Sequence, residues 1–199
     1  IGEYDGGGYS ISGLTINRSG ESYVGLFGAT TNGTIIKNLS LTNVNITGTN
    51  RVGSLVGYAR ETIIENYSAS GIVVSTSNFL VGGLVGYLYI GSTIRNSYST
   101  ASVSNGSGSY VGGLVGYSHI SNILNSYSTG SMLATSNTSY QGGLIGRNHQ
   151  STITDSFYNK ETSLQTDTGK GTGKTTAEMK TLATFTNTAT AGLSTSWDF

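Results

Sequence analysis

The stretch Val81-Gly82-Gly83-Leu84-Val85-Gly86 decides the fold, because the chain returns to nearly the same residues at a fixed interval. Its counterparts span residues 24–28, 52–57, 111–116 and 141–146. The final glycines of the five copies stand at 28, 57, 86, 116 and 146, so one repeat is 29 to 30 residues long. A repeat this short cannot enclose a core of its own, and it becomes stable only by stacking on its neighbours.

A second signature keeps the same interval. It places Ile two residues before Asn or Asp, with an aromatic residue or Leu shortly afterwards, in residues 36–39, 64–67, 94–98, 123–127 and 153–157. Two of these copies are one residue shorter after Asn, which predicts a corner that tolerates a change in length there. A weaker apolar segment follows, as in Val44-Asn45-Ile46. Each unit therefore contains three short strand candidates separated by Gly, Ser, Asn and Thr.

Three short strands in each unit, without a helical period, predict an all-β fold, namely a parallel β-solenoid (β-helix) of about five to six coils. A propeller blade needs about 40 residues, so it fits the interval less well. If Ile of the second signature faces inward, Lys37, Glu65 and Arg95 face outward on neighbouring rungs and alternate in sign. The Asn/Asp column predicts a buried amide ladder at a corner of the coil.

The repeat pattern stops near residue 160, so we expect a solenoid over residues 1–160 and a separate C-terminal part over residues 161–199. Residues 160–174 are polar and rich in Gly and Thr, which predicts a loop. Thr175 and Glu178 have the spacing of a capping box, and apolar residues follow on one helical face. We predict a short helix at about 176–185 and a capping tail that covers the open end of the solenoid.

Composition excludes several classes of protein. Gly, Ser, Thr and Asn make up more than half of the 199 residues, whereas 10% are charged and the net charge is zero. The absence of Cys excludes a disulfide scaffold and a Cys-based zinc site. Without clustered Lys and Arg, we expect no binding to nucleic acid. No apolar run approaches the roughly 20 residues of a membrane helix, so no membrane insertion is expected.

The repeats resemble the GLUG motif family, which takes its name from a Gly-Leu-hydrophobic-Gly core. The matching copies are residues 25–28, 83–86, 113–116 and 143–146, and Ser54 replaces the first Gly in the remaining copy. The lead-in Tyr4–Ile11 and the closing segment Gly173–Lys180 also resemble those of the family, so the resemblance covers nearly the whole chain. It implies large secreted bacterial or archaeal surface proteins, including adhesin-like proteins and non-catalytic regions of surface peptidases. It implies no catalytic residue.

From this resemblance and the composition we expect a non-catalytic, extracellular structural or adhesive repeat module of a cell-surface protein, without a cofactor. Expected partners are a surface glycan or a protein receptor, or further copies of the chain in an end-to-end fibre. No targeting signal is visible. Because Ile1 lies inside the lead-in, we expect the chain to be a piece of a longer protein.

Reactive residues do not assemble into a recognisable catalytic motif. Residues 169–175 resemble a phosphate-binding loop, but only three residues separate the first Gly from Gly-Lys-Thr, where four are needed. His119 and His149 each follow a repeat-final Gly by three residues and should stack on adjacent rungs. A zinc site needs three or four ligands, so this pair predicts no metal site. The ten carboxylates fall in different columns, unlike the paired acids of a glycosidase.

The most distinctive surface is an expected aromatic stripe on neighbouring rungs. The candidate ligand-binding residues are Tyr58, Tyr87, Tyr117, Arg60, Tyr89, His119 and His149. Such a row suits sugar rings or a protein partner, which makes a carbohydrate-binding module one alternative function. The other interpretation is a structural Tyr ladder or a strip that the terminal helix covers. A further alternative, ice binding, needs a flat outward array, and the available column is Thr34, Thr62, Ser92, Ser121 and Ser151.

Overall fold

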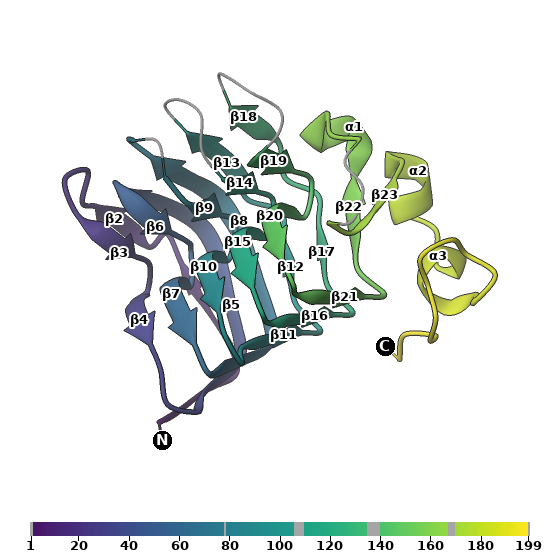
Figure 1. Cartoon of the computed structure of the whole chain (residues 1–199), viewed down its shortest axis with the longest axis horizontal. Helices are drawn as coiled ribbons and strands as arrows, with labels where there is room; N and C mark the ends of the chain where they lie inside the picture. Colours follow the sequence, from purple (N-terminus) through teal and green to yellow (C-terminus); the bar gives the residue numbers. More distant parts are fainter. Residues whose placement is uncertain (1, 78, 106–109, 135–139, 167–169, 199) are drawn as a thin grey trace.

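The computed structural model describes residues 2–77, 79–105, 110–134, 140–166 and 170–198. Successive repeats wind into a parallel β-solenoid, shown along its length in Figure 1. Two of its three sheets have five strands each, with one strand from each coil. The pairings between neighbouring coils are parallel, as in Val56 with Val85 and Val85 with Val115. The predicted solenoid and its stacking of like residues are therefore confirmed.

The strands that contain or precede the Gly-Leu-hydrophobic-Gly core form two five-stranded sheets. Sheet 1 contains β4 (Phe27–Thr30), β7 (Val56–Arg60), β10 (Val85–Tyr89), β15 (Val115–His119) and β20 (Ile145–His149). Sheet 2 contains β3 (Ser22–Val24), β6 (Asn50–Val52), β9 (Val81–Gly82), β14 (Val111–Gly112) and β19 (Gln141–Gly142). The two sheets are joined within each coil by the short bend at the middle of the motif.

Sheet 3 follows the second signature and bends round the rest of the coil. Its long strands are β1 (Glu3–Ser12), β5 (Thr34–Gly48) and β8 (Thr62–Ser75), with the short β2 (Thr15–Asn17) beside β5. In later coils the same path is divided into β11 (Thr93–Arg95), β12 (Tyr98–Ser99) and β13 (Ser102–Asn105), then β16 (Asn122–Leu124), β17 (Tyr127–Ser128) and β18 (Met132–Ala134). The last members are β21 (Thr152–Thr154), β22 (Phe157–Asn159) and β23 (Thr172–Lys174).

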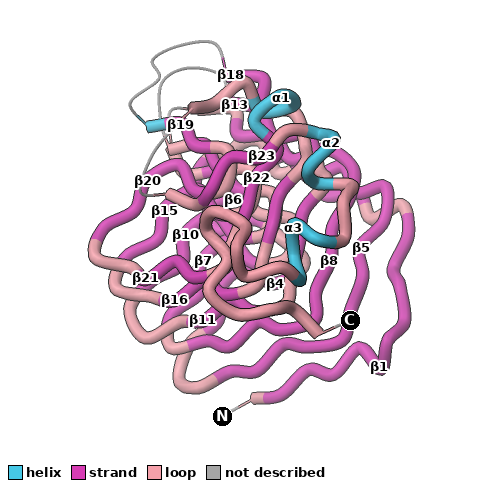
Figure 2. The backbone as a smooth tube through the Cα atoms, turned by 90° about the vertical axis from the view of Figure 1, so that its right-hand side faces the viewer, coloured by secondary structure: helices cyan, strands magenta, loops and turns pink. Residues whose placement is uncertain are grey.

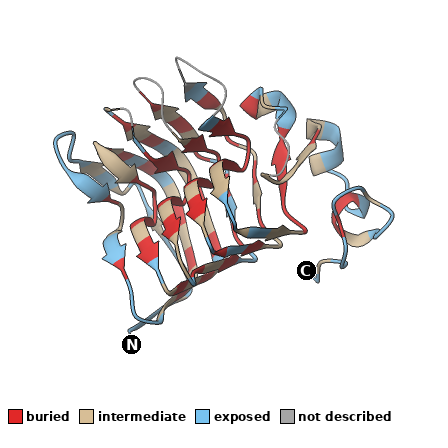
Figure 3. Cartoon of the chain, viewed as in Figure 1, coloured by how far each residue is buried: buried red, intermediate tan, exposed pale blue. Residues whose placement is uncertain are grey.

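The core is a set of vertical rows of apolar side chains inside the coil. Leu55, Leu84, Leu114 and Leu144 form one row, and all four are fully buried. The backbone N–H of Leu84 donates to the carbonyl of Leu114 at 2.9 Å, and the N–H of Leu114 donates to that of Leu144 at 2.9 Å. The buried positions recur from coil to coil (Figure 3). Stacking thus removes from water the apolar face that a single repeat leaves open.

Two neighbouring rows explain why one repeat departs from the motif. A Cβ atom on Gly83 would lie 2.1 Å from the carbonyl oxygen of Gly113 and 2.2 Å from Ser99 Oγ, so this position accepts no side chain. One coil earlier, the residue in register with Ser99 is Ala69. Its smaller side chain leaves room for Ser54, whose hydroxyl donates to the carbonyl of Gly83 at 2.5 Å. The substitution of Gly by Ser is therefore matched by a reduction in volume on the facing strand.

The expected change in length directly after Asn is wrong. Tyr98 pairs with Ser68, and each lies two residues after the Asn of its coil, so the register continues past the corner. The coils differ instead in which position carries the aromatic ring: Tyr67 is buried, whereas Tyr98 is 38% exposed. No residue is missing between these two coils, because Ala69 pairs with Ser99 and Ile72 pairs with Ser102 at equal spacing. The register shift between Leu41 and Val44 belongs to the pairing of β5 with β8.

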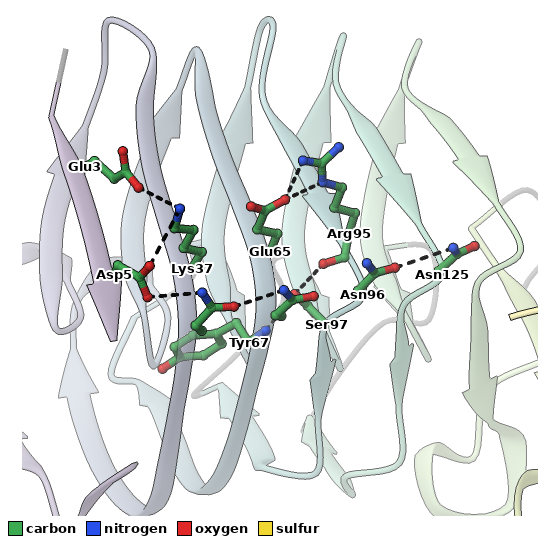
Figure 4. Close-up of polar contacts among 11 residues, drawn as sticks. Glu3, Asp5, Lys37, Glu65, Tyr67, Arg95, Asn96, Ser97 and Asn125 are labelled. Carbon is green, nitrogen blue, oxygen red and sulfur yellow. Dashed lines mark hydrogen bonds and ion pairs between the residues drawn. The ribbon is translucent and has the colours of Figure 1, made fainter. Parts of the chain in front are cut away.

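The Asn column forms a ladder, but the ladder is not buried as expected. Nδ2 of Asn38 donates to Asp5 at 3.0 Å, Nδ2 of Asn66 donates to Asn38 at 3.0 Å, and Nδ2 of Asn125 donates to Asn96 at 3.4 Å (Figure 4). All four asparagines have a positive φ between 45° and 56°. This left-handed conformation, which Asn tolerates, turns the chain sharply and leaves the amides on the outside of the corner.

The outward charged column is confirmed, although its pairs are not uniform along the solenoid (Figure 4). Lys37 Nζ contacts Glu3 at 2.7 Å and Asp5 at 3.6 Å on the preceding strand. Arg95 pairs with Glu65, its neighbour in register. Hydrogen bonds from the Gly7 backbone and Asn38, together with Lys37, lower the pKa of Asp5.

The C-terminal part packs on the last coil (Figure 2). It contains α1 (Lys160–Ser163), β23 paired with β22, α2 (Thr176–Met179) and α3 (Ala183–Thr186). The capping box of Thr175 and Glu178 is confirmed. The single helix expected at 176–185 is wrong, because α2 ends at Met179 and the separate short helix α3 begins at Ala183. The hydroxyls of Thr181 and Thr184 donate to carbonyls of residues 177 and 178, which competes with a continuous helix.

A second apolar cluster attaches this part to the solenoid. Phe157 of β22, Phe185 of α3 and Leu193 are its buried members, and Trp197 packs against them. Asp155, the last residue of the Asn/Asp column, accepts bonds from the backbone and hydroxyl of Ser194 and from the backbone of Thr195. The tail therefore returns to the corner of the solenoid.

Candidate functional site

The predicted aromatic stripe lies on sheet 1 and follows its strand register. Tyr58, Tyr87, Tyr117 and Arg147 occupy one row on β7, β10, β15 and β20. The row two residues further along contains Arg60, Tyr89, His119 and His149. All seven candidate residues are thus brought together on two adjacent outward rows, because alternate residues of a strand point to the same face.

The rings of the first row pack against one another. Tyr87 and Tyr117 are stacked with centroids 4.9 Å apart and planes within 4°. Tyr58 contacts Tyr87 edge-on at 5.6 Å. Such contacts stabilise aromatic pairs by about 0.5–1.5 kcal/mol beyond the burial of their area. The row therefore acts first as a structural ladder, in which neighbouring rings cover part of each other's faces.

The second row joins the first through its histidines. The ring centroid of His119 lies 5.2 Å from that of Tyr89 and 4.8 Å from that of His149. The Nδ1 atom of His119 is 3.3 Å from the hydroxyl oxygen of Tyr87. Burial lowers the pKa of His119, and the charges of His149 and Arg147 lower it further. Burial and the neighbouring tyrosines raise the pKa of Tyr87 to about 12. Both side chains are therefore neutral at pH 7.

Two arginines add positive charge to the stripe: Arg147 from its first row, and Arg51 from a third row beside it. The guanidinium of Arg51 lies 4.8 Å from the centroid of the Tyr23 ring and 5.8 Å from that of Tyr87. The guanidinium carbon of Arg147 lies 5.2 Å from the centroid of the Tyr110 ring, and the same guanidinium group donates a hydrogen bond to the Tyr110 hydroxyl. These are cation–π distances.

The sequence analysis missed this third row, although a signal for it exists. The residue immediately before the Val or Gln that opens each copy is Tyr23, Arg51, Leu80, Tyr110 and Tyr140. Aromatic and cationic residues occupy four of these five positions, and the period would have placed them beside the stripe.

Two alternatives for this region are wrong. The C-terminal helices do not cover the stripe, since they lie at the end of the solenoid and pack on Phe157 (Figure 1). The column considered for ice binding is not an outward array: Thr62 and Ser92 are fully buried and Ser121 is 4% exposed. Their hydroxyls point to the backbone, as when Ser92 donates to the carbonyl of Tyr89 at 2.7 Å.

Within the described part of the chain, His, Asp and Glu do not gather in groups of three or more that could hold a metal ion. His119 and His149 are each other's neighbours, and the other rings beside His119 belong to Tyr89 and Tyr117. In the same described ranges, no helix is both long and apolar enough to cross a membrane. The stripe offers hydroxyls, ring edges and guanidinium groups, which are suited to recognition.

Comparisons with known proteins agree with this architecture. Residues 77–104 and 107–131 match the family described as the GLUG motif, which confirms the resemblance seen in the repeats. Halomucin of Haloquadratum walsbyi is 38% identical over 103 residues, which are 52% of this chain and 1% of halomucin.

A crystal structure described as that of a "putative immunoglobulin A1 protease" from Bacteroides ovatus superposes with a TM-score of 0.60. It is 21% identical, and the alignment covers 78% of this chain and 51% of that chain. At this level of identity the likeness shows the fold alone.

Proposed function

Because the chain carries GLUG repeats, we propose that it is a non-catalytic structural and adhesive module of an extracellular cell-surface protein. The observation that carries the proposal is the continuous parallel register of sheet 1, which presents one row of side chains after another on a continuous face. The GLUG motif and the similarity to halomucin support a surface-protein repeat.

The stacked coils suit a rigid spacer. Each inner strand of sheet 1 pairs with a neighbour on both sides, as β10 does with β7 and β15. Bending the rod would stretch these hydrogen bonds and separate the buried leucines inside it. Since each coil contacts only its neighbours, added coils lengthen the rod without changing its cross-section.

The adhesive face is the aromatic stripe with its arginines. Tyr and Arg are the residue types most enriched at the energetic centres of protein interfaces. Arg51 and Arg147 lie over tyrosine rings, which holds their guanidinium groups in place before a partner arrives. We propose a protein receptor with acidic side chains as the partner of this face.

The test uses the organism that encodes the chain. An antibody against the folded repeats should label intact cells, and deletion of the repeats should reduce attachment while growth continues. The double variant Arg51→Ala, Arg147→Ala should reduce attachment at unchanged surface level. Absence of surface label contradicts the location, and unchanged attachment contradicts the adhesive role.

We also propose that copies assemble end to end. In the described part of the chain, β4 and β20 are the outer strands of sheet 1 and pair on one side only. Such edges can pair with the strand of another copy. Electron microscopy of the purified chain should show filaments, and separate short particles at high concentration would refute the assembly.

The module is proposed to be non-catalytic, although one solved structure of similar fold is described as a protease. In the described part of the chain, the contacts of His119 are with Tyr87, Tyr89, Tyr117 and His149, and none is with the carboxylate that a catalytic triad needs. Screens against peptide and polysaccharide substrates should detect no turnover. Turnover that persists in highly purified protein and is lost on His119→Ala would overturn this part of the proposal.

A further inference from the structure

A groove with a volume of about 540 Å³ lies between the corner of the solenoid and the returning C-terminal tail. Its solenoid wall includes Asn96, Tyr98, Asn125 and Tyr127, and its tail wall includes Trp197 and Asp198. The groove belongs to sheet 3, whereas the aromatic stripe belongs to sheet 1. We call it the corner groove.

Aromatic rings form one surface of the corner groove. Tyr98 and Tyr127 are stacked with centroids 4.8 Å apart and planes within 2°. The ring of Trp197 continues the stack, with its centroid 6.2 Å from that of Tyr127 and an angle of 29° between the two ring planes. On the opposite side of Tyr98 the residue in register is Ser68, which has no ring to cover the tyrosine face. The stack therefore ends in a half-exposed aromatic surface on the groove.

Amide groups line the groove beside these rings. Asn96 and Asn125 belong to the corner ladder, in which Nδ2 of Asn125 donates to Oδ1 of Asn96 at 3.4 Å (Figure 4). A side-chain amide has two N–H donors and two acceptor lone pairs, so this bond leaves each residue with further donors and acceptors. Asn66 extends the same wall by one coil.

The tail wall is held in place by the solenoid itself. Ser194 Oγ donates to Asp155 at 3.0 Å, and the backbone N–H of Thr195 donates to the same carboxylate at 3.2 Å. The backbone N–H of Trp197 donates to the carbonyl of Phe185 at 2.8 Å. The groove is thus formed before a ligand arrives, which lowers the entropic cost of binding.

We propose that the corner groove binds a neutral saccharide. The apolar C–H face of a pyranose ring fits against Tyr98, while its hydroxyl groups exchange hydrogen bonds with the amides of Asn96 and Asn125. Among the described residues that line the groove, Asp198 is the one that carries a charge, so they offer no cation to a sulfated or carboxylated sugar. Its volume lies in the range of about 300–1,000 Å³ typical of small-molecule sites.

This proposal does not depend on the adhesive role of sheet 1, because the two surfaces share no residue. It assigns the corner groove a ligand whose hydroxyls match the amides and whose ring matches the exposed tyrosine face. An extended peptide is the competing occupant, and the experiment separates the two.

The chain itself provides a reporter, since Trp197 is the sole tryptophan of the sequence. The intact chain is titrated with neutral disaccharides (cellobiose, lactose and mannobiose), with uronate oligomers and with a mixed peptide library, while tryptophan emission is recorded. We expect saturable changes with at least one neutral disaccharide, weaker changes with uronates and none with peptides. Tyr98→Ala should weaken binding about tenfold or more.

The controls distinguish the corner groove from the stripe and from loss of folding. Tyr98→Phe keeps the ring and should retain most of the affinity, whereas Asn125→Ala should weaken it. Tyr87→Ala, on sheet 1, should leave binding unchanged. Melting temperatures show whether each variant folds. The proposal is overturned if folded wild-type chain ignores all neutral disaccharides at millimolar concentration, if peptides bind instead, or if Tyr98→Ala and Asn125→Ala bind as wild type does.

Discussion

Replacing Gly112 by Ala places a single methyl group where the stacked coils leave no space. The new Cβ would lie 2.0 Å from the carbonyl oxygen of Val115, 2.7 Å from the backbone nitrogen of Gly146 and 2.8 Å from the carbonyl carbon of Val115. All three atoms belong to backbone, so no side chain can rotate away to relieve the contact. Relief requires the motif turn of one coil to move relative to the next.

Inserting extra atoms into a packed core typically costs about 1–3 kcal/mol and sometimes more. Because the contacts at Gly112 are with backbone on two coils, we expect the upper end, about 3 kcal/mol. For a chain of this size, each kcal/mol lowers the melting temperature by roughly 2–4 °C, so Gly112→Ala should melt about 6–12 °C below wild type.

Thermal unfolding followed by circular dichroism measures this difference, with Gly20→Ala as the matched control. A Cβ on Gly20 meets no atom within 4 Å, and its φ does not require glycine. Because Ala has fewer backbone conformations than Gly in the unfolded chain, the free energy of unfolding of this variant should stay unchanged or rise by up to about 1 kcal/mol. The reasoning is refuted if Gly112→Ala melts within about 2 °C of wild type, or no lower than Gly20→Ala.

Three other variants or measurements test separate parts of the structure. Leu114→Ala removes a fully buried side chain and should lower the free energy of unfolding in urea by about 2–5 kcal/mol; a loss below 1 kcal/mol would contradict a packed leucine row. Asp155→Asn replaces an acceptor of the Ser194 bonds by an N–H donor, so the Trp197 emission should shift to the red; unchanged emission would show that these bonds do not hold the tail. An NMR titration should find the pKa of His119 below 6.5, and its contribution to stability should be present above pH 6.5 and lost as the pH falls through the lowered value. A midpoint at or above 6.5 would contradict the burial of this ring.

Rows of like residues could be predicted because the copies are nearly equal in length. Tyr58, Tyr87 and Tyr117 each follow a repeat-final Gly, and equal path lengths bring them onto neighbouring strands. The same logic placed His119 beside His149. A structural Tyr ladder was one interpretation of this row, but the sequence did not give the angles between the rings, because ring orientation depends on side-chain torsions and on the cation that joins from a neighbouring row.

At the corner, the side of the strand on which a ring lies was harder to predict than the residues with which it is in register. Tyr67 and Tyr98 stand one and two residues after the Asn of their coils, and a gap after Asn seemed to explain the difference. The register shows no gap there, so one ring enters the core and the other faces the corner groove. In a strand, a shift of one residue moves a side chain to the opposite face.

The sequence by itself determined the solenoid and the order of residues along each row. It could do so because a repeat that stacks in register converts sequence period into spatial adjacency. It did not determine the division of each coil into strands, because the Gly-Leu motif bends into two strands on two sheets. Only the tertiary structure decided where the non-repeating tail returns, how Asp155 binds Ser194, and that Trp197 stacks on Tyr127 at the corner groove. Contacts between segments that share no period leave no trace in the spacing of residues, since they depend on the path of the chain after the last coil.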